Sequence, residues 1–325
     1  MALEARCDFL EFTVPFDRKS NLLGVLPGGV EPLDRGWRGY THSALVAGGK
    51  GRVGWSPGRQ EMGFHVSLGS QALGVLAGLN EAWADVPDVL SFVRDDLGGH
   101  CTRFDVAWDD TSGMLDLGVI DGAIDRGEFT SRWKGGYGRS GWGNQAGETR
   151  YFGSGRSDAM LRIYDKAKER ASKGETVDHE QWVRVELVFR RARADAVAAV
   201  FQRVKTRPKE TFLYLAGILR SYLEFKQPNA TDTNKRRWVP AAWWDAFLGF
   251  VEKARLVLTE KIVRTVHHVK GWVSAQVAPS LALLERAMGF NDAWAFLFSE
   301  AQEGRSRWGP RHRAILAASG VPVSC

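Results

Sequence analysis

Polar and apolar residues alternate along three segments in the middle of the chain. In residues 102–110 (TRFDVAWDD) the apolar members fall on one face and the polar members on the other: Phe104, Val106 and Trp108 against Arg103, Asp105 and Asp109. Alternation with period two is typical of a strand with one buried face. Residues 160–166 (MLRIYDK) and 182–190 (WVRVELVFR) repeat the pattern. The sequence therefore predicts three strands, each with a polar face.

Shorter patterns flank these segments. Residues 1–70 contain brief β-branched and aromatic runs separated by Gly and Pro, which predict short strands. Residues 71–97 and the chain beyond Ala192 carry apolar residues at helical spacing, so both are expected to be helical. Residues 132–155 are rich in glycine and basic residues and predict a long loop with a strand near its end. No repeat of fixed period is visible.

These elements predict an α+β fold, in which a largely antiparallel β-sheet has helices on one face and is followed by a helical C-terminal module. The Pro-, Asn- and Thr-rich stretch at 227–240 is the expected linker. We therefore expect an α+β domain that carries the chemistry over residues 1–226 and the helical module over residues 241–325.

Composition and charge narrow the class of protein. No stretch approaches the roughly 18 apolar residues of a membrane span, and the first residues carry charge where a signal peptide needs an apolar run. We expect a cytoplasmic protein with no membrane partner. Three widely spaced cysteines predict neither a disulfide framework nor a zinc site. The net charge of +6 divides into −5 over residues 1–110, +8 over 111–240 and +3 over 241–325, which suits a polyanionic partner.

The three polar faces carry an unusual set of side chains: Arg103, Asp105, Asp109, Arg162, Tyr164, Lys166, Arg184 and Glu186. If the strands are neighbours, the carboxylates can hold a hard divalent cation, and the Tyr164 phenolate can attack phosphorus. Arg162, Lys166 or Arg184 can then stabilise the charge of the transition state. Cross-strand Arg–Glu pairs are also ordinary on exposed sheet faces, so the pattern alone leaves a structural role open.

In order and spacing, TRFDVAWDD, YFGSGRSDAMLRIYDKAKE and WVRVELVFR resemble the signature segments of rolling-circle replication initiators of the pT181 plasmid type. That replication initiation factor family includes phage initiators and relaxases of integrative conjugative elements. The resemblance implies that Tyr164 nicks DNA at a double-strand origin of a plasmid or phage and forms a covalent 5′-phosphotyrosine. It also implies that Asp105 and Glu186 bind Mg²⁺ or Mn²⁺, with Asp109 as a further candidate ligand.

The resemblance further implies origin DNA, a host helicase and a second copy of the chain as partners, although no interface pattern in the sequence indicates the last two. The His-hydrophobic-His metal motif of the larger class of rolling-circle nucleases is absent. His267 and His268 are adjacent in an expected helix, where their side chains diverge by about 100° and cannot easily share a metal.

Basic residues in the glycine-rich loop, beside it and in the expected linker are candidate contacts to DNA: Arg132, Lys134, Arg139, Arg156, Lys235, Arg236 and Arg237. A flexible loop and a solvated charge run explain the same residues. Three other functions also fit the sequence. They are a conjugative relaxase that nicks a transfer origin, a non-catalytic sequence-specific DNA-binding protein, and a metal-dependent phosphodiesterase that uses water.

Overall fold

The computed structural model describes residues 4–16, 22, 26, 29–77, 79, 83–135, 137–140, 148–256, 266, 269–270, 273–309, 312–313 and 315–316. The chain divides into two compact units, Met1–Leu258 and Thr259–Cys325. The first unit contains all three strands that carry the candidate chemistry.

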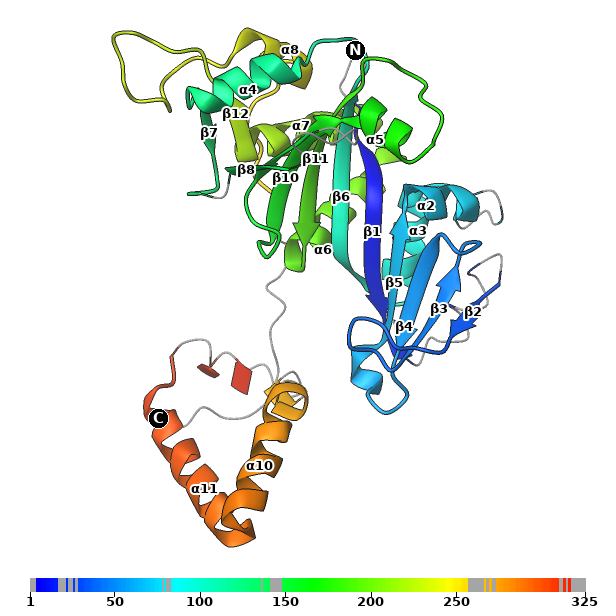
Figure 1. Ribbon diagram of the computed structural model, residues 1–325, viewed down its shortest axis with the longest axis vertical. Helices are drawn as coiled ribbons and strands as arrows, with labels where there is room; N and C mark the ends of the chain where they lie inside the picture. The colour runs from blue at the N-terminus through cyan, green and yellow to red at the C-terminus, as the bar shows by residue number, and fades with distance from the viewer. Residues whose placement is uncertain are drawn as a thin grey trace. The chain divides into compact units, whose positions relative to one another are not determined.

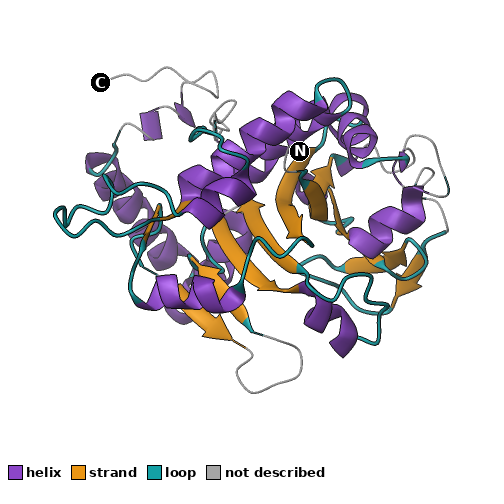
Figure 2. Cartoon of the chain, turned by 90° about the horizontal axis from the view of Figure 1, so that it is seen from above, coloured by secondary structure: helices purple, strands orange, loops and turns teal. Residues whose placement is uncertain are grey.

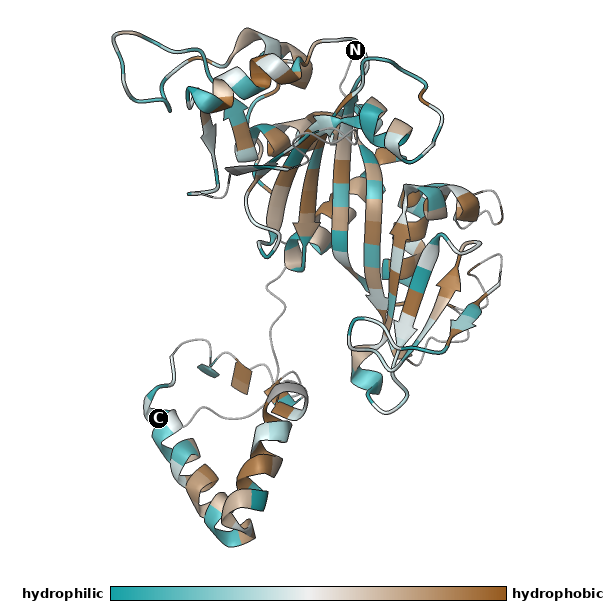
Figure 3. Cartoon of the chain, in the orientation of Figure 1, coloured by the Kyte–Doolittle hydropathy of each residue, from teal (hydrophilic) through white to brown (hydrophobic). Residues whose placement is uncertain are grey.

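A ten-stranded antiparallel sheet forms the framework of the first unit (Figure 1), with the order β2-β3-β4-β5-β1-β6-β11-β10-β9-β8. Its strands are β1 (Arg6–Val14), β2 (Glu31–Leu33), β3 (His42–Val46), β4 (Gly51–Trp55), β5 (Phe64–Gly69), β6 (His100–Asp110), β8 (Tyr137–Ser140), β9 (Thr149–Phe152), β10 (Ala159–Asp165) and β11 (Val183–Arg190). Figure 3 shows polar bands interrupting the apolar residues of β1 and β6, as period-two alternation requires. The expected α+β fold with a largely antiparallel sheet is confirmed.

The strand order repeats about the central β1–β6 pair. In each half the chain starts at the centre, crosses to the edge and returns strand by strand, and it then enters a helix: α2 (Ser70–Ala77) after β5 and α6 (Ala192–Phe201) after β11. The registers also correspond, because Glu11 pairs with Ser67 as Asp105 pairs with Val188. Glu11 and Asp105 therefore occupy equivalent positions, although the sequence shows no repeat.

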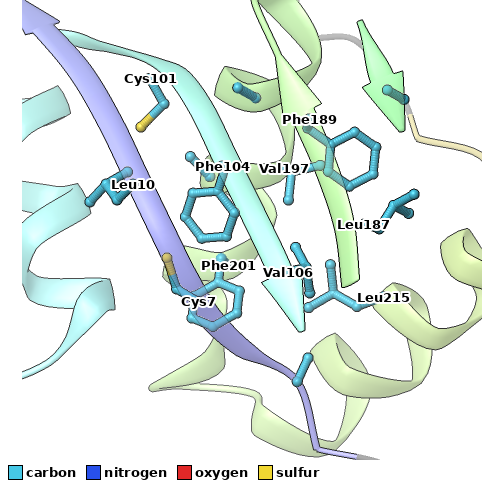
Figure 4. Close-up of a cluster of buried hydrophobic side chains, with 14 of the residues drawn as sticks. Cys7, Leu10, Cys101, Phe104, Val106, Leu187, Phe189, Val197, Phe201 and Leu215 are labelled. Carbon is cyan, nitrogen blue, oxygen red and sulfur yellow. The ribbon is translucent and has the colours of Figure 1, made fainter. Parts of the chain in front are cut away.

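Helices pack against the apolar face of the sheet (Figure 2). They include α3 (Val86–Ser91) with the π-helical turn Phe92–Asp96, α6, and α7 (Pro208–Tyr222). Figure 4 shows side chains of β6 and β11 meeting those of α6 and α7: Phe104, Val106, Leu187 and Phe189 against Val197, Phe201 and Leu215. These positions alternate with the polar ones on β6 and β11, so the polar residues face away from this core.

Smaller elements complete the first unit. They are 3₁₀ turns at Gln60–Met62 and Gln202–Val204, α4 (Leu117–Asp125), α5 (Lys166–Ser172), and a two-stranded sheet of β7 (Phe129–Ser131) and β12 (Leu223–Phe225). The expected loop over residues 132–155 contains β8 as well as the expected strand near its end, β9. Its residues 141–147 lie outside the described residues.

The expected boundary at 227–240 differs from the observed division of the chain. The segment after it forms α8 (Ala242–Leu248). Trp244 of this helix is fully buried, and the centre of its ring lies 5.2 Å from the centre of the Phe225 ring. The stretch itself is tied across its ends by the hydrogen bond from Gln227 N to Val239 O. It is therefore a connection within the first unit, and the units divide after Leu258.

The helical structure expected beyond Ala192 is interrupted where α8 ends at Leu248. Gly249 adopts the left-handed conformation with φ of 73°, Phe250 follows with φ of 58°, and residues 251–256 have no regular structure. In the second unit the described helices are the π-helical turn Val273–Val277, α10 (Ala278–Met288) and α11 (Phe290–Ser306), where helical spacing predicted them. Among the residues described, no helix is long and apolar enough to cross a membrane.

Candidate functional site

Tyr164, Glu186 and Asp105 lie on neighbouring strands and on one face of the sheet. The strands β10, β11 and β6 are adjacent, and Arg162 pairs in register with Glu186. The hydroxyl of Tyr164 donates a hydrogen bond to Oε2 of Glu186 over 3.1 Å. Arg162 forms an ion pair with Glu186 and lies 3.5 Å from Asp105 Oδ2. The convergence that the strand patterns required is therefore present.

Asp105 and Glu186 form a buried carboxylate pair beneath arginines. Both side chains are 0% exposed, whereas those of Arg103 and Arg162 above them are 21% and 28% exposed. Arg103 donates two hydrogen bonds to Asp105, from Nε over 2.9 Å and from a terminal nitrogen over 2.5 Å. Burial, together with the charge of Glu186, raises the pKa of Asp105 to about 7. The two carboxylates therefore repel each other, and the arginines offset that repulsion only in part.

This pair fits a divalent cation by its donor chemistry. Mg²⁺ prefers oxygen ligands and is commonly held by one or two carboxylates, with waters and phosphate oxygens completing its shell. The repulsion between Asp105 and Glu186 is the interaction that a cation between them would relieve. Within the described part of the chain, no group of three or more His, Cys, Asp and Glu side chains is arranged to hold a metal ion. Asp105 and Glu186 are therefore the candidate ligands at this position.

Tyr164 is held in its protonated form. Burial and the adjacent charge of Glu186 raise the pKa of the phenol well above its ordinary value. Arg184 and Arg162 act in the opposite direction but do not outweigh these two effects. A proton acceptor is therefore needed before the phenol can act as a nucleophile, and Oε2 of Glu186 is in hydrogen-bonding position.

Lys166 does not continue the strand, so its expected place on the strand face is wrong. Strand β10 ends at Asp165, whose carboxylate caps α5 by accepting a hydrogen bond from the Lys168 backbone N–H over 2.8 Å. Lys166 is the first residue of that helix, and its Nζ lies 2.6 Å from Glu169 Oε2. The ammonium group still reaches 5.8 Å from the centre of the Tyr164 ring. A short Asp-initiated helix has replaced the last position of the expected strand.

Asp109 joins Arg184 rather than the carboxylate pair. Arg184 is buried, and it donates to Asp109 from Nε over 2.7 Å and from a terminal nitrogen over 2.9 Å, while Asp8 takes its other terminal nitrogen. The indole of Trp182 also donates to Asp109 over 2.7 Å. Asp105 and Asp109 are four residues apart on one strand, which separates their Cα atoms by roughly 13 Å. Although Asp105 and Asp109 lie on the same face, they are therefore too far apart to bind one ion.

Two residues of this surface were not assigned a role from the sequence. Arg103 lies on the same face as Asp105 because the two residues are two positions apart on one strand. This alternation could have identified Arg103 as a member of the site. Asp8 lies at a register shift between Cys7 and Phe9 on β1, which turns it toward Arg184. No alternation in the sequence could have placed Asp8 there.

The candidate DNA contacts fall into two groups. The side chains of Arg132, Lys134, Arg156 and Arg236 are exposed, and the Arg132 guanidinium lies 4.8 Å from the centre of the Tyr222 ring. Protein groups engage the other three: Arg139 lies 2.9 Å from Asp125, Lys235 donates to Gly127 O over 2.6 Å, and Arg237 donates twice to Asp232. His267 and His268 lie outside the described residues.

The first half of the sheet has no phenol at the place equivalent to Tyr164. Glu11 stands where Asp105 stands in the second half, and it accepts hydrogen bonds from Arg38 over 2.5 Å and Ser67 over 3.0 Å. By the same register His65 corresponds to Glu186, and Ser56 corresponds to Tyr164. At these equivalent positions, all among the described residues, the second half alone combines a carboxylate pair with a phenol.

Three comparisons with known proteins agree on one family. A family model described as replication initiation factor matches residues 99–297. The Bacillus subtilis (strain 168) protein NicK, named as a DNA relaxase, is 30% identical over 198 residues, which are 58% of this chain. The match spans 54% of NicK, about half of its length. A solved rolling circle replication initiator protein from Geobacillus stearothermophilus has a TM-score of 0.62 and 26% identity, and the match covers 80% of this chain and 100% of that one.

Proposed function

The chain belongs to the replication initiation factor family, and we propose from this premise that it nicks and rejoins one strand of DNA to initiate rolling-circle replication. Tyr164 is the nucleophile. The observation that carries the proposal is the hydrogen bond between Tyr164 and Glu186, with Asp105 beside them, on three adjacent strands. The substrate is an origin on a plasmid or phage.

In the proposed reaction the hydroxyl oxygen of Tyr164 attacks the phosphorus of a phosphodiester. The phenol proton passes to Oε2 of Glu186, which already accepts its hydrogen bond. The bond between phosphorus and the 3′ oxygen breaks, and that oxygen leaves with the bonding electrons and takes up a proton. The products are a 5′-phosphotyrosine and a free 3′ hydroxyl that can prime synthesis. Because the phosphodiester energy is kept in the covalent bond, rejoining requires no ATP.

Asp105 and Glu186 would hold Mg²⁺ or Mn²⁺, which supplies Lewis-acid polarisation of the phosphate when bound. Arg162 contacts both carboxylates and its side chain is partly exposed, so it is suited to meet a phosphate oxygen. The Lys166 ammonium, which is paired with Glu169, lies 5.8 Å from the centre of the Tyr164 ring and adds positive charge on this side of the site. Arg184 forms ion pairs with both Asp8 and Asp109. Its role is therefore to stabilise the sheet face next to Tyr164.

A conjugative relaxase acting at a transfer origin is the second candidate, because NicK is named as a relaxase. The replication initiator is preferred because the solved initiator is covered over its whole length. A dimer and a host helicase partner stay predictions of the family resemblance, and a cytoplasmic location stays a prediction from the composition of the sequence.

The test incubates the protein with supercoiled DNA that carries its own origin, with and without Mn²⁺. We expect nicked circles and a protein–DNA adduct that resists SDS, both dependent on the metal. A phosphodiesterase that uses water would give nicks without an adduct, and a non-catalytic DNA-binding protein would give neither. A transfer origin that is nicked in preference to the replication origin would favour the relaxase.

A further inference from the structure

Three arginines surround the carboxylate pair on the sheet face. Arg103 on β6 and Arg162 on β10 bind Asp105 and Glu186. Arg190, the last residue of β11, pairs in register with Arg103 and therefore lies on the same face.

Arg190 is the member of this group whose charge is not matched by an ion pair. Among the described residues, no carboxylate is found within ion-pair distance of it, and its printed hydrogen bond runs from a terminal nitrogen to Ser157 O over 3.4 Å. Burial and the charges of Arg103 and Arg162 lower its pKa. Nε of Arg162 is also buried with no hydrogen-bond partner among the described residues. Arg190 thus adds a positive charge beside Arg103 and Arg162 and has no carboxylate of its own among the described residues.

The internal repeat shows that the fold itself does not need these arginines. In the first half Phe9 pairs with Gly69 as Arg103 pairs with Arg190 in the second half. The position equivalent to Arg162 is Gly54, which pairs with His65. All three arginines therefore occur only on the half that carries Tyr164.

We propose that Arg190, together with Arg103, forms a binding site for a backbone phosphate of the DNA strand, next to the phosphate that Tyr164 attacks. Glu186 and Arg190 are four residues apart on β11, so their Cα atoms lie roughly 13 Å apart, too far to share one phosphate. The planar guanidinium fork matches phosphate oxygens, and the half-buried position strengthens the interaction. The turn that positions Arg190 through Ser157 also carries the exposed Arg156, which extends the site toward solvent. The identity of the ligand as a nicked strand rests on the proposed function.

The experiment measures binding of a fluorescein-labelled oligothymidylate by anisotropy at a series of NaCl concentrations, in full-length chain that carries Tyr164→Phe. Adding Arg190→Ala should weaken binding about tenfold at low salt and reduce the slope of log K against log salt by about 0.7, the value for one phosphate contact on a single strand. Arg190→Lys should keep the slope, because it keeps the charge. The control is Arg207→Ala, which removes an exposed arginine at the N-cap position of α7 and gives the same net charge as Arg190→Ala.

If Arg190→Ala and Arg207→Ala give the same affinity and slope, the phosphate site is refuted. Should the alanine variant fail to fold, Arg190→Gln against Arg190→Lys makes the same comparison at nearly constant side-chain size, and equal slopes refute the site. The proposed function is tested separately by adduct formation in the chain that keeps Tyr164. A chain that binds through Arg190 but never forms the adduct would refute nicking and keep the phosphate site. If the chain forms the adduct normally but Arg190→Ala does not change the salt slope, the phosphate site is refuted and the nicking function is kept.

Discussion

The hydroxyl of Tyr164 lies 3.1 Å from Oε2 of Glu186, and the two residues come from adjacent strands, β10 and β11. In the proposed reaction Glu186 is therefore both the acceptor for the phenol proton and one of the two carboxylates that would hold a cation. Arg162 binds the same carboxylate. In the proposed reaction, the reactivity of Tyr164 therefore depends on a residue on the neighbouring strand.

Tyr164→Phe is expected to abolish the SDS-resistant adduct and leave DNA binding intact. Removing the hydroxyl costs the buried Glu186 carboxylate one hydrogen bond, so the free energy of unfolding should fall by about 1.5 to 3 kcal/mol. The matched control is Tyr151→Phe, since Tyr151 lies in register with Arg162 on the next strand. Adducts are measured by gel mobility after SDS treatment. Loss of the adduct in the Tyr151 variant instead would move the nucleophile to β9.

Glu186→Gln is expected to remove metal-dependent nicking and to lower the affinity for Mn²⁺ at least tenfold. The amide keeps the size of the side chain but provides neither the negative charge for the cation nor a base for the phenol. Calorimetric titration with Mn²⁺ measures the first effect and the supercoiled DNA assay the second. Glu11→Gln, at the equivalent position of Asp105 in the other half, serves as the control. Unchanged Mn²⁺ affinity in Glu186→Gln would contradict the two-carboxylate site.

Asp109→Asn is expected to destabilise the protein by about 3 kcal/mol at pH 7, because it breaks a buried ion pair with Arg184. Burial opposes the charge of Asp109, but the hydrogen bonds and charge of Arg184 outweigh it and hold the pKa of Asp109 below its ordinary value. A lowered pKa contributes stability above the unfolded-state value near 3.9, and that contribution is lost as pH falls through the folded-state pKa. Urea unfolding from pH 7 down to pH 3 should show the difference between variant and wild type shrinking below about pH 4. A constant difference over this range would contradict the assignment.

Trp244→Ala is expected to destabilise the first unit by about 3 to 5 kcal/mol, because it empties a fully buried position in α8. A fragment of residues 1–258 should unfold cooperatively, and one of residues 1–240 should be less stable because it lacks α8. Trp294→Ala is the control, since that side chain is 55% exposed in the second unit. Equal stability of the two fragments would restore the boundary at 227–240.

Period-two alternation placed Tyr164, Asp105 and Glu186 on the polar faces of their strands. In a strand with one buried face, a shift of one residue would move every side chain to the other face, so the apolar positions fix the orientation of the polar ones. The order and spacing of the three segments identified the family. Helical spacing found α10 and α11 but not the end of α8, since the left-handed Gly249 and Phe250 stop the helix without changing the apolar period. Lys166 was misplaced because one residue decides whether a strand continues or an Asp-capped helix begins.

The sequence by itself determined which residues could reach a common face, since that depends only on local backbone geometry. Only the tertiary structure decided how those residues are paired. It paired both Asp109 and Asp8 with Arg184, and it paired Glu186 with Tyr164. These pairs depend on strand register and on the register shift at Asp8. It also revealed the repeated strand order, in which Glu11 and Asp105 are equivalent while Gly69 and Arg190 differ. Register is fixed by packing between strands far apart in the chain, and no short window of sequence contains it.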